Sequence, residues 1–204
     1  MSVRWLSSLS RPGSVPGFED VTILMAAVTT AAASVIAVPG LAGVAGAGLA
    51  CVMVAIAAVD ARRFIIPDEL SAAALALGLG HVAIAHPDAI GEALAAAALR
   101  GGVMAMLFFA LWAGYRRLRG RDGIGLGDVK LAGVAGVWLD WTSLPIAVEI
   151  AALAALAVCL VRSVAFGRRI SAGTRLPFGL FLAPAIWIAW LGETMLPPLM
   201  LGLG

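Results

Sequence analysis

Residues 41–59, LAGVAGAGLACVMVAIAAV, form an uninterrupted apolar stretch that ends at Asp60. About 20 apolar residues in a helix span the hydrocarbon core of a bilayer, so this stretch predicts a transmembrane helix. It does not alternate with period two, as a strand of a membrane barrel would. The 204-residue chain is 62% hydrophobic and 13% charged, whereas soluble domains are roughly a quarter charged. We therefore expect an all-α, polytopic transmembrane helix bundle.

Proline, glycine and charged segments divide the chain into about seven apolar runs. The first run lies behind a long polar segment and is too long for the apolar part of a signal peptide, so we expect a retained helix. Residues 1–18 then form a polar tail, residues 19–40 an additional transmembrane helix, and residues 41–204 a six-helix core. The expected helices cover approximately residues 21–38, 41–59, 70–85, 90–114, 126–141, 144–161 and 177–196.

Basic residues predict the orientation of the bundle. They precede the first run and follow the second, fourth and sixth, and the loops on the other side contain no Lys or Arg. Cytoplasmic loops are enriched in these residues, so we expect a cytoplasmic amino terminus and an external carboxyl terminus. A surface for anionic lipid or an acidic partner is the alternative interpretation. The residues are Arg4, Arg11, Arg62, Arg63, Arg116, Arg117, Arg119, Arg121, Arg162, Arg168, Arg169 and Arg175.

Aromatic residues fit the same topology. Trp112 and Tyr115 are expected at the inner membrane boundary, and Trp138 and Trp141 at the outer one, because such side chains favour the interface.

Two acids fall on the predicted cytoplasmic side. Asp60 ends the second run, and Asp128 begins the fifth, just after Gly125 and Gly127. Ionisable residues at membrane depth are costly and suggest a functional site. If the second and fifth helices touch, the two carboxyls hold one proton between them. One acid can then accept a proton from water while the other polarises a carbonyl, and the glycines leave space for a substrate strand.

Three segments carry a resemblance to a known family: DARRFIIPDEL at residues 60–70, GLGDVKL at 125–131 and LPFGLFLAPA at 176–185. Together they resemble the prepilin peptidases, or type IV leader peptidases, which are Gly-x-Gly-Asp intramembrane aspartyl proteases. The resemblance covers roughly residues 41–190. It implies that Asp60 and Asp128 are catalytic and that short basic leaders are cut from prepilin-like precursors, just before their hydrophobic helix and commonly after a glycine. It also implies an inner-membrane protein with its site near the cytoplasmic face.

Many bacterial members of that family carry paired Cys-x-x-Cys motifs associated with methylation of the new amino terminus. This chain has only Cys51 and Cys159, so it resembles the peptidase-only members and methyltransferase activity is not expected. We expect no cofactor and no metal, because Cys ligand pairs are absent and His81 and His86 are expected near a helix end, in a loop. No nucleic-acid-binding motif occurs. The expected partners are precursor proteins, the lipid bilayer and pilus or secretion assembly components.

Other residues in and near these motifs are expected to bind substrate or to support the motifs. For several of them a purely structural role is the alternative. Asp68 and Glu69 can cap the next helix after Pro67 and favour its dipole. Lys130 can pair with an acid or extend to the inner interface, and Pro177 can start the last helix. The sequence spacing does not identify an acidic partner for the Arg100 side chain. The supporting set is Gly125, Gly127, Pro67, Asp68, Lys130, Pro177, Phe178 and Gly179.

Two rival functions remain open from the sequence. One is a small transporter that uses Asp60 and Asp128 as a proton or cation relay, and the other is a non-catalytic assembly partner. The Pro-Asp after Asp60 and the complete GLGDVKL segment favour the protease. Paired interrupted helices in two related halves, which many transporters have, are not found.

Overall fold

The computed structural model describes residues 18–120, 125–166 and 177–196. These residues form seven α-helices, one 3₁₀ turn and no strand, which confirms the predicted all-α class. The elements are α1 (Phe18–Ala37), α2 (Leu41–Arg63), α3 (Asp68–Ala85), η2 (Pro87–Ala89), α4 (Ile90–Arg119), α5 (Leu126–Trp138), α6 (Ser143–Phe166) and α7 (Gly179–Met195).

Helix ends fall where the sequence has residues that end helices. Gly40, between α1 and α2, has a φ of 78°, and Gly120, after α4, has a φ of 67°; glycine adopts such angles without steric cost. Pro67 precedes α3, and Pro87 opens the turn before α4. The largest differences from the expected bounds are at the ends of α4 and α6, which each continue about one further turn.

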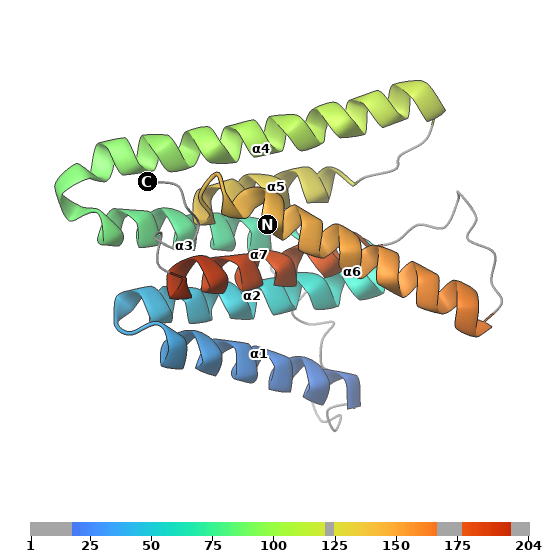
Figure 1. The fold of residues 1–204 in the computed structure, drawn as a ribbon, viewed down its shortest axis with the longest axis horizontal. Coiled ribbons are helices and arrows are strands. Elements are labelled where there is room, and N and C mark those ends of the chain that lie inside the picture. Colours follow the sequence, from blue (N-terminus) through green and yellow to red (C-terminus); the bar gives the residue numbers. More distant parts are fainter. Residues whose placement is uncertain (1–17, 121–124, 167–176, 197–204) are drawn as a thin grey trace.

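Successive helices run in opposite directions (Figure 1), so the ends of α2, α4 and α6 lie at the same end of the bundle as the starts of α3, α5 and α7. Because Asp60 is near the end of α2 and Asp128 near the start of α5, both acids lie at this end. α7 packs against α2, α5 and α6, while α4 covers α3 and α5 on one side and α1 covers α2 on the other.

Five helices are long and apolar enough to cross a membrane: Glu19–Ala37, Leu41–Arg63, Asp68–Ala85, Pro87–Arg119 and Ser143–Val164. α7 is a shorter apolar helix of 17 residues, and α5 has 13 residues. The short helices are central, and most of α5 is buried. The chain is therefore a multi-pass membrane protein whose shorter helices are surrounded by longer ones.

Small residues allow the helices to pack closely. A Cβ atom added at Gly136 of α5 would lie 2.6 Å from the backbone of Arg100 in α4, and one at Gly46 of α2 would lie 1.9 Å from the Trp190 ring in α7. Glycine at such crossings brings helix backbones together, which is the usual basis of helix association in membranes.

Two predictions about aromatic and histidine residues are wrong. Trp138 is buried instead of lying at the outer interface, and its Nε1 donates a hydrogen bond to the Ala74 carbonyl at 2.8 Å. His81 belongs to α3 instead of a loop and stacks on Trp138 with ring centroids 5.3 Å apart. Trp141 is exposed. The His81 and Trp138 rings meet because α3 and α5 pack against each other.

The structure identifies the hydrogen-bond and ion-pair partners of Arg100, which the sequence did not. Its Nε donates to the carbonyl of Gly136 at 3.2 Å, and its Nη1 lies 3.6 Å from Oδ1 of Asp140 in the turn after α5. A guanidinium within an apolar helix is thus bonded to a backbone acceptor and a carboxylate. The polar tail and the basic residues Arg4, Arg11, Arg121, Arg168, Arg169 and Arg175 lie outside the described residues.

Candidate active site

Asp60 lies in the last turn of α2 and is 5% exposed. The helix ends four residues later at Phe64, whose N–H donates to the Asp60 carbonyl at 2.8 Å. Phe64 has a φ of 56°, a left-handed conformation that costs a non-glycine residue roughly 1–2 kcal/mol. This sharp helix end turns the chain so that Ile66, which is buried, returns toward the bundle beside Asp60.

The Asp60 carboxyl meets the start of α7. Its Oδ2 accepts a hydrogen bond from the Leu180 N–H at 2.9 Å. The first N–H groups of a helix have no acceptor within the helix, and the positive end of the helix dipole favours an anion there. Gly179 makes this approach feasible, because a Cβ atom at that position would lie 2.8 Å from Oδ2 of Asp60 and 2.7 Å from Cδ1 of Ile66.

Asp128 occupies the first turn of α5 and is 6% exposed. Its Oδ2 accepts the N–H of Gly125, the residue that precedes the helix, at 3.0 Å. Gly125 has ordinary extended angles, so its backbone conformation does not require glycine. Gly127 is required for a different reason, because its Cβ would lie 2.9 Å from Cβ of Ile66.

Ile66 and α7 connect the two acids. Ile66 packs between Gly127 of α5 and Gly179 of α7, and Gly179 also touches Asp60. The Asp60 and Asp128 carboxyls are close enough to interact electrostatically. Direct contact between α2 and α5 was the condition for the acids to meet; the two helices make few direct contacts, and α7 packs against both. The site is thus built from two acids and two helix N-termini around one isoleucine.

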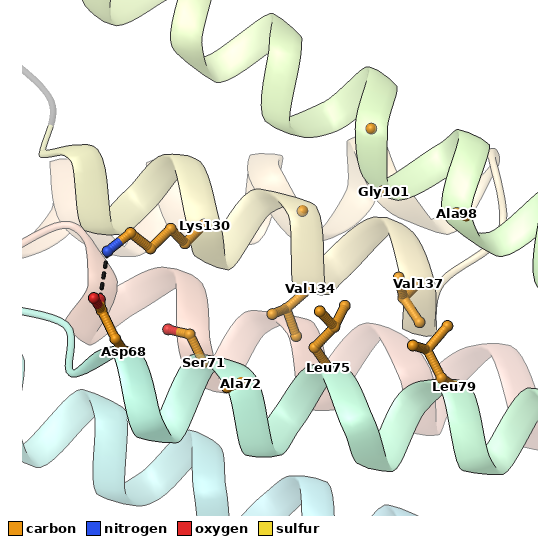
Figure 2. A pocket seen from close by; sticks show the side chains of 12 residues that line it. Asp68, Ser71, Ala72, Leu75, Leu79, Ala98, Gly101, Lys130, Val134 and Val137 are labelled. Atoms are coloured by element: carbon orange, nitrogen blue, oxygen red, sulfur yellow. Dashed lines mark hydrogen bonds and ion pairs between the residues drawn. The ribbon is translucent and has the colours of Figure 1, made fainter. Parts of the chain in front are cut away.

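Lys130, two residues after Asp128 in α5, forms an ion pair with Asp68 of α3 (Figure 2). The pairing of Lys130 with an acid, one of its two expected alternatives, is confirmed. Capping of α3 by the Asp68 side chain is not confirmed, because Pro67 occupies the cap position and no side-chain capping bond forms. Pro177 precedes the cap residue Phe178 and so lies before the first turn of α7.

Two parts of the site were not identified from the sequence. The Leu180 N–H is a backbone donor that could be inferred only by knowing which helix start faces Asp60. The left-handed Phe64 has no sequence signal, because glycine or asparagine usually occupies such positions.

Within the described residues no group of three or more His, Cys, Asp or Glu side chains could hold a metal ion.

The fold and the site define a class, a polytopic helical membrane protein with two interacting buried carboxyls at one end of its bundle. The sequence profile of the type IV leader peptidase family matches residues 47–160, a range that includes both acids. The chain belongs to the type IV leader peptidase family.

Individual relatives agree with this family. Leader peptidase HopD of Escherichia coli is 36% identical over 136 residues, which are 67% of this chain and 84% of HopD. A prepilin leader peptidase/N-methyltransferase of Burkholderia pseudomallei is 37% identical over 150 residues, 71% of this chain but 45% of that protein. The corresponding protein of Aeromonas hydrophila is 30% identical over 198 residues, 94% of this chain and 64% of the relative. No solved structure gives a significant match.

Proposed function

We propose that the chain is an intramembrane aspartic endopeptidase that removes short basic leaders from prepilin-like precursors at the cytoplasmic face of the inner membrane. One observation carries the proposal. Asp60 and Asp128 come from different helices, are both buried at the same end of the bundle, and interact with each other. Membership of the type IV leader peptidase family supports peptide hydrolysis as the reaction.

The chemistry uses one proton held by the pair. The ionised carboxyl removes a proton from a water molecule as the water oxygen attacks the scissile carbonyl carbon, and the protonated carboxyl donates its proton to the carbonyl oxygen. The tetrahedral intermediate then collapses: the protonated carboxyl gives its proton to the leaving nitrogen, the C–N bond breaks, and the other carboxyl takes a proton from one hydroxyl of the intermediate as the new carboxyl group forms. The acids end with the single proton that they held at the start.

The charge distribution supports a cytoplasmic site. Arg62 and Arg63 end α2, and Arg116, Arg117 and Arg119 lie in the last turn of α4, all at the end of the bundle that carries the acids. Basic residues mark the cytoplasmic side of membrane proteins. A site at this face is accessible to a precursor whose leader is still in the cytoplasm.

Two narrower statements accompany the proposal. The chain cuts without methylating the new amino terminus, which its two separate cysteines support because no Cys-x-x-Cys pair occurs in these 204 residues. Residues 19–40 form a helix added to a peptidase core, which the profile match supports because it begins at residue 47. A mass measurement of the mature product tests the first statement, since methylation would add about 14 Da.

Substituting the acids tests the mechanism. Asp60→Asn and Asp128→Asn should each abolish cleavage of a precursor peptide by purified enzyme, because neither amide can take part in proton exchange. The double variant should be no worse than either single variant, since residues that act as one unit are strongly non-additive. Product is measured by mass spectrometry and folding by thermal unfolding. EDTA should leave the wild-type rate unchanged.

Asp88→Asn provides a matched control, because Asp88 lies in η2 near the opposite end of the bundle. It should retain the wild-type rate. Full cleavage by a folded Asp128→Asn protein would refute the aspartic mechanism and would favour the proton-relay transporter.

A further inference from the structure

α7 contains a proline, Pro184, beyond its first turn. Proline has no backbone N–H, so it cannot donate the helical hydrogen bond to the carbonyl four residues earlier. That carbonyl belongs to Leu180. At membrane depth an acceptor freed by a proline is normally bonded by another group, because the hydrocarbon offers no donor. The Leu180 carbonyl therefore calls for a donor other than the residue that would supply it in an unbroken helix.

Leu180 is also the residue that holds Asp60. Its N–H donates to Oδ2 of Asp60 at 2.9 Å. The nitrogen and the carbonyl oxygen of one residue are roughly 3–4 Å apart, so the Leu180 oxygen lies within about 7 Å of the Asp60 carboxyl. An extended chain rises about 3.3 Å per residue, so this separation corresponds to about two residues of a bound peptide. The freed acceptor is thus next to the candidate acids.

The missing bond lies on the least buried face of α7. Leu180 and Pro184 are half-buried, and Ile188, the next residue on this face, is 45% exposed. Leu182 and Ala183, on other faces of the helix, are buried. Among the residues that the structure describes, no side chain donates a hydrogen bond to the Leu180 carbonyl. A peptide beside α7 can therefore reach this acceptor.

The direction of α7 indicates which part of a precursor meets the carbonyl. α7 begins at the end of the bundle that carries the acids and runs toward the opposite end (Figure 1). Helical N–H groups point toward the start of a helix and carbonyls toward its end, so the Leu180 carbonyl lies farther along the bundle than Asp60. A precursor with its leader at the acid end and its apolar helix in the membrane brings the residues that follow the cut to this position.

We propose that the Leu180 carbonyl accepts a hydrogen bond from a backbone N–H of the precursor, at the second or third residue after the scissile bond. This inference rests on the proposed function, in which the cut falls just before the precursor's hydrophobic helix. Leu180 then holds Asp60 through its N–H and the extended substrate through its carbonyl. Main-chain hydrogen bonds of this kind supply affinity without reading side chains, so the contact positions the scissile bond in precursors of differing sequence.

Pro184→Ala tests the inference, because it returns the missing N–H to the helix. The new N–H bonds to the Leu180 carbonyl and withdraws it from the substrate. The variant should melt at a higher temperature than the wild type, because proline is strongly unfavourable in a helix interior. Its KM should nevertheless rise about fivefold, the size of one hydrogen bond. A role of Pro184 in stability alone would not combine a more stable protein with weaker binding.

Pro145→Ala is the matched control. Pro145 lies in the first turn of α6, where a backbone N–H has no acceptor within the helix. No carbonyl is therefore freed by this proline, and the KM of Pro145→Ala should equal that of the wild type.

Ester probes identify the substrate N–H. The parent probe is a synthetic segment with a Lys/Arg-rich leader ending in glycine, followed by an apolar helix of about 20 residues, and the full-length proteins are in phospholipid nanodiscs. An ester oxygen replaces the N–H of the second or third residue after the cut, or of the third residue before it as a control. One of the two esters after the cut should raise the KM about fivefold in the wild type and less than about twofold in Pro184→Ala, which has already lost the acceptor. The control ester should have the same effect in both proteins.

Equal losses from the esters in the wild type and Pro184→Ala would overturn the inference, and so would a wild-type KM of Pro184→Ala for the parent probe. Failure of the proposed function is a different result, in which the wild-type protein does not cleave the parent probe. The dissociation constants of the parent and ester probes, measured by fluorescence anisotropy with the same proteins, would then decide whether the hydrogen bond forms, since binding requires no cleavage.

Discussion

Gly179 is the residue on which the approach of Asp60 to α7 depends. A side chain there would collide with the Asp60 carboxyl and with Ile66, so alanine must displace one of them. Displacement of either weakens the bond from the Leu180 N–H or moves Ile66 from its place between the helices. The residue therefore controls the position of an acid to which it contributes no functional group.

We expect Gly179→Ala to lower kcat/KM at least about tenfold, equivalent to roughly 1.4 kcal/mol of transition-state stabilisation, because misplacement of a reacting group is costly. Gly192→Ala is the control, since Gly192 is on the same helix and its Cβ would meet nothing within 4 Å. Peptide cleavage and thermal unfolding are measured for both. Wild-type activity in Gly179→Ala would show that the acid does not need its observed position.

The Asp68–Lys130 ion pair links α3 to α5 at the surface. Its side chains are 76% and 48% exposed, and exposed ion pairs contribute roughly 0–1 kcal/mol. Asp68→Asn should therefore keep most of the catalytic rate, and Lys130→Ala should fall between Asp68→Asn and the catalytic variants. A double-mutant cycle on thermal stability should give a coupling energy of about 0.2–1 kcal/mol. A value near zero would show that the pair does not persist in the membrane.

The crossing of α4 and α5 depends on Gly136. We expect Gly136→Ala to destabilise the protein by about 1–3 kcal/mol, the usual cost of overpacking, because its Cβ would lie 2.6 Å from the backbone of Arg100 and Gly101. Gly133→Ala, on the same helix, should be tolerated, since its nearest neighbour would be 3.5 Å away. Thermal unfolding in detergent compares the two variants, and equal melting temperatures would contradict the close crossing.

Helix positions were more predictable from the sequence than helix rotations. The apolar runs and their prolines and glycines predicted all seven helices, because a bilayer dictates their length and composition. The partners of Arg100 and the burial of Trp138 could not be predicted. A helix that is apolar on all sides carries no stripe that identifies its inward face. For the same reason the sequence left open whether the second and fifth helices touch, and in the structure α7 connects them.

At the scale of the whole molecule, the alternating helices predict the sidedness of every loop. Reporter fusions after Pro39, His86 and Ser143 should report the external side, and fusions after Arg63 and Gly120 the cytoplasmic side. The basic residues at the ends of α2 and α4 are the physical reason. Activity of paired external and cytoplasmic reporters is the measurement. A cytoplasmic signal at His86 would overturn the orientation and would place α3 on one side of the membrane.

The unequal lengths of α4 and α5 have a consequence for the surrounding lipid. At 1.5 Å per residue, the 30 residues of α4 extend about 45 Å and the 13 residues of α5 about 20 Å, against a hydrocarbon thickness of about 30 Å. No bilayer matches both lengths, and hydrophobic mismatch acts chiefly on the outer helices, which carry most of the exposed apolar side chains. The outer helices therefore set the depth of Asp128 below the headgroups, so a cell that shortens its fatty acids brings this carboxyl closer to the membrane surface.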